Sequence, residues 1–149
     1  NNATIDMTSV VNTVYNDVAT DDEKKEFEFI VDDIPDARGD VSAVVQIWSN
    51  LIGNELKYSG KSKTKSITIG SIEKDHVPAY FIKDCGVGFN PDYKHKLFEV
   101  FERLHSEEEF SGTGIGLAIV KRLVDLHGGT VWAESQVNDG ATFYFVLQP

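Results

Sequence analysis

Four polar residues recur along one face of a predicted helix: Gln46, Asn50, Asn54 and Lys57 lie at i, i+4, i+8 and i+11. Glutamate or lysine is the common choice for a face that only meets water, and asparagine is a poorer helix former. One interpretation is an ordinary solvated face. The other is a ligand site, in which the amide oxygen of Asn54 binds Mg²⁺ and Lys57, one turn on, reaches a phosphate.

A second candidate is the stretch "DCGVGFNP" at 84–91, which directly follows a predicted strand. The carboxylate of Asp84 only accepts hydrogen bonds, so it could accept one from the exocyclic amine of adenine, whereas guanine has a carbonyl at that place. Aspartate and glycine are also common turn residues, and a plain turn is therefore the alternative.

A third candidate is "FSGTGIGLAIV" at 110–120, where Gly112, Gly114 and Gly116 precede an aliphatic run. Glycine destabilises a helix by roughly 1 kcal/mol relative to alanine, so its use at a helix start favours close approach of backbone N–H groups to an anion. No Lys-Ser/Thr pair follows, as in a Walker motif, and no strand precedes, as in a Rossmann fingerprint. The stretch predicts phosphate binding by a different fold.

The apolar periodicity around these stretches predicts three helices and five strands. Helices are expected at 8–18, from 41 onward after Asp40, and at 115–127 before two glycines; strands are expected at 24–31, 65–72, 78–84, 130–135 and 141–148. Residues 33–40 are predicted to form a turn-rich link, and the mixed stretch 89–112 to contain a short helix at 94–101. This order predicts an α+β fold, with helices covering one face of a mainly antiparallel sheet.

Composition limits the classes of protein that fit. The chain has 149 residues, 41% of them hydrophobic, and a formal net charge of −10. This predicts one globular domain over 1–149 and argues against a nucleic-acid binder. Because Cys85 is the only cysteine and no apolar run reaches the ~20 residues of a membrane span, a cytoplasmic location is expected. The chain begins without methionine, so we expect a piece of a longer protein that is itself soluble or membrane-anchored.

Five stretches in fixed order carry a family resemblance. "NLIGNELKYSG", "DCGVGFN", "LFEVFERL", "GTGIGLAIV" and "GATF" resemble the N box, first glycine box, F box, second glycine box and last glycine motif of the ATP-binding catalytic domain of sensor histidine kinases, in the GHKL superfamily. The resemblance runs from about Ile5 to Leu147. It implies a Bergerat-type two-layer α/β sandwich, whose mixed sheet is covered on one face by about three helices.

The resemblance also implies roles for individual residues. Asn54 would coordinate Mg²⁺, Asn50 and Lys57 would hold the phosphates of ATP, and Asp84 would accept from the adenine amine. Residues 112–117 would form the hinge of a lid over the triphosphate, and Arg103 would meet the γ-phosphate unless it is simply exposed. Asn50, Asn54 and Lys57 are the implied catalytic residues. The rest of the implied ATP-binding set comprises Tyr58, Asp84, Gly86, Gly88, Phe89, Arg103, Thr113, Gly114, Ile115, Gly116, Leu117 and Thr142, with Thr142 supporting the adenine site.

The implied function is donation of the γ-phosphate of Mg-ATP to a histidine on a separate dimerisation and phosphoacceptor hairpin. None of the four histidines lies in an "H-E-hydrophobic" helical context, so we expect that hairpin to be absent and the histidines to be structural or surface residues. The expected partners are the hairpin of the parent kinase and a response regulator, with no nucleic acid or membrane contact. The isolated domain is expected to be a monomer.

Two other functions remain open at this stage. A GHKL ATPase, like the gyrase, mismatch-repair or chaperone groups, would have a glutamate that activates water at the place of Asn50, and asparagine is no general base. A nucleotide-binding module without transfer is the other. The sequence departs from the family pattern at Glu55, where alanine is common. We interpret this as a packing or surface change that points away from the ligand, because one helical position is a rotation of ~100°.

Overall fold

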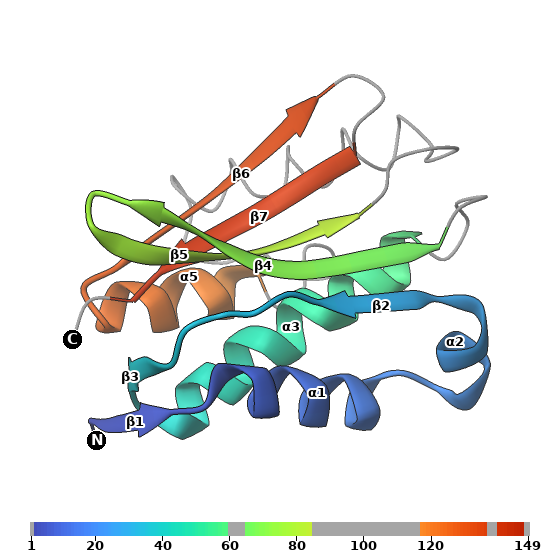
Figure 1. The fold of residues 1–149 in the computed structure, drawn as a ribbon, viewed down its shortest axis with the longest axis horizontal. Coiled ribbons are helices and arrows are strands. Elements are labelled where there is room, and N and C mark those ends of the chain that lie inside the picture. Colours follow the sequence, from blue (N-terminus) through green and yellow to red (C-terminus); the bar gives the residue numbers. More distant parts are fainter. Residues whose placement is uncertain (1, 60–64, 85–116, 137–139, 148–149) are drawn as a thin grey trace.

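The computed structural model describes residues 2–59, 65–84, 117–136 and 140–147. Its main body has two layers, a five-stranded sheet and a layer of helices against one face of it (Figure 1). The sheet order is β2-β4-β5-β7-β6, with β2 parallel to β4 and all other neighbours antiparallel. The strands are β2 Glu28–Val31, β4 Ser66–Lys74, β5 Val77–Asp84, β6 Thr130–Gln136 and β7 Gly140–Val146. The predicted α+β class with a mixed sheet is confirmed.

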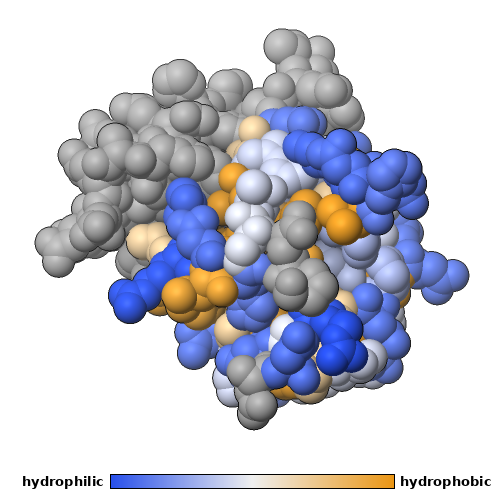
Figure 2. Space-filling model, turned by 90° about the vertical axis from the view of Figure 1, so that its left-hand side faces the viewer, coloured by the Kyte–Doolittle hydropathy of each residue, from blue (hydrophilic) through white to orange (hydrophobic). Residues whose placement is uncertain are grey.

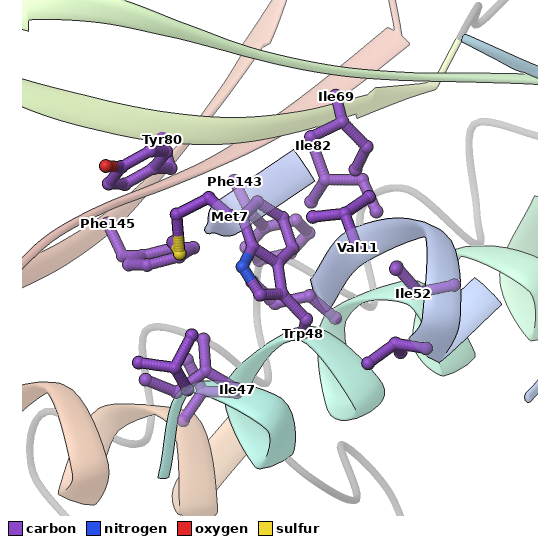
Figure 3. Packing of buried hydrophobic residues seen from close by; sticks show 14 of the residues in the cluster. Met7, Val11, Ile47, Trp48, Ile52, Ile69, Tyr80, Ile82, Phe143 and Phe145 are labelled. Atoms are coloured by element: carbon purple, nitrogen blue, oxygen red, sulfur yellow. The ribbon is translucent and has the colours of Figure 1, made fainter. Parts of the chain in front are cut away.

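Three helices cover the sheet: α1 (Met7–Val18), α3 (Val41–Ser59) and α5 (Leu117–Leu126). Their apolar stripes and the inward side chains of the strands form one core (Figure 3). At its centre the indole of Trp48 lies edge-on to the rings of Tyr80 and Phe145, with centroids 6.4 Å and 5.0 Å away. Such aromatic packing fixes how α3 sits on the sheet.

The Tyr80 hydroxyl makes a polar contact at the edge of this core. It donates a hydrogen bond to the Pro35 carbonyl at 2.8 Å. Burial, and secondly the negative charge of Asp36, raise the pKa of Tyr80 to about 12. The hydroxyl therefore stays protonated across the physiological range.

The two predicted hairpins are confirmed. In β4–β5, the two turn residues Asp75 and His76 have positive φ values of 52° and 69°. This is the mirror-image turn that matches the twist of paired strands. His76 is exposed at this turn, as its predicted surface role requires.

The chain between residues 20 and 40 differs from the prediction. Residues 24–26 belong to a short helix, α2 (Asp21–Glu26), and not to the strand predicted at 24–31. Thr20 and Glu23 form a reciprocal capping box, with bonds of 3.1 Å and 2.9 Å, and this S/T-x-x-E signal explains the helix. The predicted link 33–40 contains β3 (Ala37–Gly39), which pairs with β1 (Ala3–Ile5). Three-residue strands are too short to show a period.

The C-terminal end of α5 stops at glycines, as predicted. Gly128 adopts a positive φ of 68°, and the Gly129 N–H donates to the Val124 carbonyl at 3.0 Å. His127, directly after α5, links this helix to α3: its Nε2 accepts a hydrogen bond of 3.2 Å from the Asp40 N–H at the start of α3. The end of α5 therefore lies at the start of α3, and α5 begins towards the C-terminal half of α3.

None of the helices in the described ranges is long and apolar enough to cross a membrane.

Candidate functional site

The polar face predicted on α3 exists. Gln46 and Lys57 are exposed, and Asn50 and Asn54 are partly exposed, while the opposite face of the helix is buried in the core. The Asn50 amide nitrogen Nδ2 donates to the Gln46 carbonyl at 2.8 Å. This bond commits the amide nitrogen to the helix and leaves the oxygen Oδ1 as the atom that a ligand would meet.

Asn54 differs from the other residues of this face in its hydrogen bonding. Its amide nitrogen Nδ2 is buried and has no hydrogen-bond partner among the described residues. A buried polar atom without a partner destabilises a protein by about 1–3 kcal/mol, so it calls for an explanation, and a ligand bound at the polar face of α3 is one. The hydroxyl of Tyr15 and Nε1 of Trp48 are two further such atoms among the described residues. The Asn54 side chain is thus held in a position that folding alone does not favour.

This donor set fits Mg²⁺ brought by a nucleotide. Mg²⁺ is typically held by one or two protein oxygens together with substrate phosphates and waters. Within the described part of the chain, no group of three or more His, Cys, Asp or Glu side chains could hold a metal by itself. The single amide oxygen of Asn54 suits a Mg²⁺ ion that is held jointly by the protein, the phosphates and water. Lys57, one turn further along the helix, could contact a phosphate.

Asp84 lies at the end of β5 and is only 2% exposed. Side chains alternate along a strand, and Tyr80, Ile82 and Asp84 all face the helices. Its partner in the β4 register is Ile67, which belongs to the core. The carboxyl therefore lies where the core meets the end of the sheet.

Thr142 is not brought together with Asp84. In the register of β5 and β7 it pairs with Lys83, so its side chain lies on the face of the sheet opposite to that of Asp84. The next residue, Phe143, points into the core. A base held at Asp84 would meet the other face of β7, and Thr142 therefore has no direct route to the predicted adenine contact.

Leu117 is the first described residue of α5, and its side chain is fully buried in the core. Its predicted nucleotide contact can only come from the backbone. Most of the other predicted site residues lie outside the described residues: Gly86, Gly88, Phe89, Arg103, Thr113, Gly114, Ile115 and Gly116, together with the side chain of Tyr58. Cys85, His95, His105 and the short helix predicted at 94–101 lie there too.

Glu55 decides between the two alternatives predicted for it, a packing change or a surface change. It is 1% exposed, so it is a packing change on α3. It follows Trp48 and Ile52 at i+7 and i+3, on the stripe that faces the sheet. The sequence alone left the choice open, because glutamate is almost never fully buried unless it is paired.

The family model described as "Histidine kinase-, DNA gyrase B-, and HSP90-like ATPase" matches residues 39–149. Among curated proteins, cyanobacterial phytochrome B of Nostoc sp. is 42% identical over 105 residues, which is 69% of this chain and 14% of that protein. The sensor histidine kinase WalK of Bacillus subtilis is 34% identical over 110 residues, 72% of this chain and 18% of WalK. The chain thus spans less than a fifth of the length of these relatives.

Solved structures agree with this fold. The mycobacterial sensor histidine kinase MprB superposes with a TM-score of 0.67 at 25% identity, covering 100% of this chain and 98% of that chain. The catalytic domain of histidine kinase ThkA gives a TM-score of 0.71 at 21% identity, covering 99% and 97%. Full-length ShkA, solved in complex with AMPPNP, gives 0.70 at 25% identity and covers 98% and 30%. The chain belongs to the family of histidine kinase-, DNA gyrase B- and HSP90-like ATPases, with the fold of histidine kinase catalytic domains.

Proposed function

We propose that this chain binds Mg-ATP and donates the γ-phosphate to a histidine on a separate dimerisation and phosphoacceptor hairpin. The observation that carries the proposal is the polar face of α3, where the buried amide nitrogen Nδ2 of Asn54 lacks a partner among the described residues. Curated relatives such as WalK are named histidine kinases, and ShkA was solved with an ATP analogue.

Each described residue of the site has a proposed part. The Asn54 oxygen would bind the metal, while Asn50, oriented by its bond to the Gln46 carbonyl, and Lys57 would hold phosphate oxygens. Asp84 would accept from the adenine amine. Bound Mg²⁺ would neutralise charge on the phosphates.

Asn50 also bears on the choice between transfer and hydrolysis. An asparagine amide cannot take a proton from water, so the site should protect ATP from hydrolysis. Phosphoryl transfer needs mainly positioning and charge neutralisation, and a histidine acceptor is already nucleophilic. The residues therefore favour a kinase over an ATPase of the same family.

The partners and the setting form part of this proposal. Residues 1–149 would act as one domain and as a monomer, in the cytoplasm, where ATP is available. The hairpin of the parent kinase would present the histidine, and a response regulator would receive the phosphate. The lid, with its predicted hinge at residues 112–117, would close over the triphosphate.

The test is a transfer assay with γ-labelled ATP, Mg²⁺ and the phosphoacceptor hairpin of the parent protein. We expect label on the hairpin, negligible label on this chain alone and only slow loss of ATP. A hairpin without its histidine is the matched control and should stay unlabelled. Acid-labile phosphate on this chain alone, rapid hydrolysis, or nucleotide binding without transfer would each contradict the proposal.

A further inference from the structure

The helix layer has a groove on its surface, between α1 and α3, which lie side by side (Figure 1). The cavity has a volume of about 210 Å³, and all of its lining residues come from these two helices. From α3 it takes Val45 and Ser49, which directly precede Gln46 and Asn50 of the polar face. One helical position is a rotation of ~100°, so the groove is separate from the proposed nucleotide site.

Three valines form the apolar part of this lining: Val10 and Val14 of α1 and Val45 of α3. All three pack in or against the core, so the fold fixes their positions. The valines are buried or half-buried, while Ser9 and Thr13 beside them are exposed. The groove therefore has an apolar floor and a polar rim.

The lining contains one charged residue, Asp17, which is exposed and lies one turn beyond Val14. It is the only charged residue of α1, and it lies in the last turn, where the helix dipole disfavours a negative charge. Asp17 makes no hydrogen bond or ion pair with another residue in the described ranges, the two lysines of α2 included. A cation at this end of the groove would therefore compensate a charge that no described residue pairs with.

An apolar floor that ends at a carboxylate is complementary to a side chain with an aliphatic stem and a cationic head. Lysine and arginine bury such stems along apolar surface and keep the charge at its edge. Arginine suits a carboxylate better, because its guanidinium donates two parallel hydrogen bonds and is more weakly hydrated than an ammonium. The volume is below the ~300–1,000 Å³ of small-molecule sites, so the groove suits one side chain of a protein better than a free metabolite.

A helix is the element that would present this side chain. Helices pack by fitting ridges of side chains into grooves, and a third helix can lie along the surface where α1 and α3 meet. We propose that the groove is a docking site for a helix of a partner protein, with the stem of one arginine on the three valines and its guanidinium at Asp17. This goes beyond the proposed function, because it involves neither the nucleotide nor the transferred phosphate.

The probe is a helical peptide of about 20 residues, made of alanine, leucine and glutamine with one central arginine. Its control carries citrulline at that place, which has nearly the shape of arginine but no charge. Both peptides are titrated into the isotope-labelled chain at low salt and followed by NMR. We expect the arginine peptide to bind about fivefold more tightly, and the difference to shrink at high salt. The largest signal shifts should occur at Val10, Thr13 and Val45.

Variants of the chain locate the charge that is recognised. Asp17→Asn should abolish the difference between the two peptides, because the amide carries no charge. The matched control is Asp21→Asn, which removes an exposed carboxylate at the start of α2, outside the groove, and should keep the difference. Thr13→Arg places a guanidinium four residues before Asp17 on the same helix, so it should occupy the groove and weaken the arginine peptide by a similar factor. Thermal unfolding checks that each variant is folded.

Several results would overturn the inference. Equal binding of the two peptides, or a difference that survives Asp17→Asn, would exclude recognition of the cation by this carboxylate. An equal effect of Asp21→Asn would assign the preference to the net charge of −10, and shifts outside α1 and α3 would place the peptide elsewhere. If N-acetylarginine amide binds as tightly as the peptide, the groove is a small-molecule site and not a docking surface. Mg-ATP is absent from these titrations, so a failure of the proposed function leaves their outcome unaffected.

Discussion

The two ends of α3 are built differently. At its start, the Asp40 carboxylate accepts from the Ala43 N–H at 3.2 Å, and the Asp40 N–H donates to Nε2 of His127. The other ring nitrogen of His127 lies 2.8 Å from the Leu123 carbonyl. We call this junction, with the end of α5 beside it, the closed end, because its polar groups satisfy one another. His127 is thus structural, as predicted.

The C-terminal half of α3, together with Asp84 at the end of β5, is the site end. Here the buried Asn54 nitrogen has no hydrogen-bond partner among the described residues, and two carboxyls are buried. Figure 2 views the molecule from the side of the closed end, where hydrophobic residues appear as separate spots among hydrophilic ones. One helix therefore serves stability at one end and, in our proposal, ligand binding at the other, where local rules of good packing are broken.

The largest effect on stability is expected at the closed end, from Gly129→Ala. A Cβ at residue 129 would lie 1.7 Å from the backbone carbonyl oxygen of Val146, so β7 would have to move. We expect the free energy of unfolding in urea to fall by about 3 kcal/mol.

Gly53→Ala is the matched control, since its Cβ meets nothing nearer than Val18 Cγ1 at 3.7 Å. Alanine in mid-helix should stabilise the chain by about 0.5–1 kcal/mol. Equal effects of the two alanines would contradict the packing described for the closed end.

Asn54→Ala should separate function from stability at the site end. We expect transfer to the hairpin to fall at least about 100-fold, equivalent to about 2.7 kcal/mol, because the proposed metal ligand is lost. The melting temperature should stay the same or rise, since the variant removes a buried atom that lacks a partner among the described residues.

The control is Gln46→Ala, which removes another amide from the same helix face and should change transfer by less than about threefold. A loss of stability that parallels the loss of transfer in Asn54→Ala would assign Asn54 to folding.

Alkaline pH should weaken the core at Tyr80. Its pKa of about 12 in the folded chain lies above the ordinary tyrosine pKa of 10.0, so the unfolded chain loses the proton first. The stabilisation is complete below pH 10 and is lost as pH rises towards 12, by about 2 kcal/mol. In Tyr80→Phe the fall in stability over this window should be smaller, as measured by urea unfolding at a series of pH values. An unchanged slope would mean that Tyr80 does not carry the effect.

The smallest effect is expected from Asp40→Ala, which removes the side chain that accepts from the Ala43 N–H. Loss of such a cap typically lowers stability by about 1 kcal/mol. Nucleotide affinity should be unchanged, because the residue lies at the closed end. A clear loss of affinity at full stability would show that the two ends are coupled.

Much of this architecture could be predicted from periodicity. The helices α1, α3 and α5 and the strands of both hairpins each have the apolar periodicity of an element with one buried face. The end of α5 was predicted from the two glycines that follow it, and Gly128 does adopt a positive φ there. The first part of the chain was harder, because α2 is set by one capping box and β1 and β3 have three residues each.

The site was predicted only in part. The polar face of α3 is visible in the sequence because amides at helical spacing are unusual there. Two features depend on tertiary structure: the choice of packing over surface for Glu55, which the sequence left open, and the strand register that turns Thr142 away from Asp84, which it did not predict. Neighbouring residues of a strand lie on opposite faces of the sheet, so a sequence motif alone could not show which face the Thr142 side chain occupies.

In our proposal, the site end recognises an adenine nucleotide through Asp84. The most direct measurement is calorimetric titration of the unmodified chain with Mg-ATP and with Mg-GTP under the same conditions. We expect ATP to bind at least about tenfold more tightly, because the Asp84 carboxylate would accept from the adenine amine and would face a carbonyl on guanine. Equal affinity for the two nucleotides, or no binding of either, would contradict it.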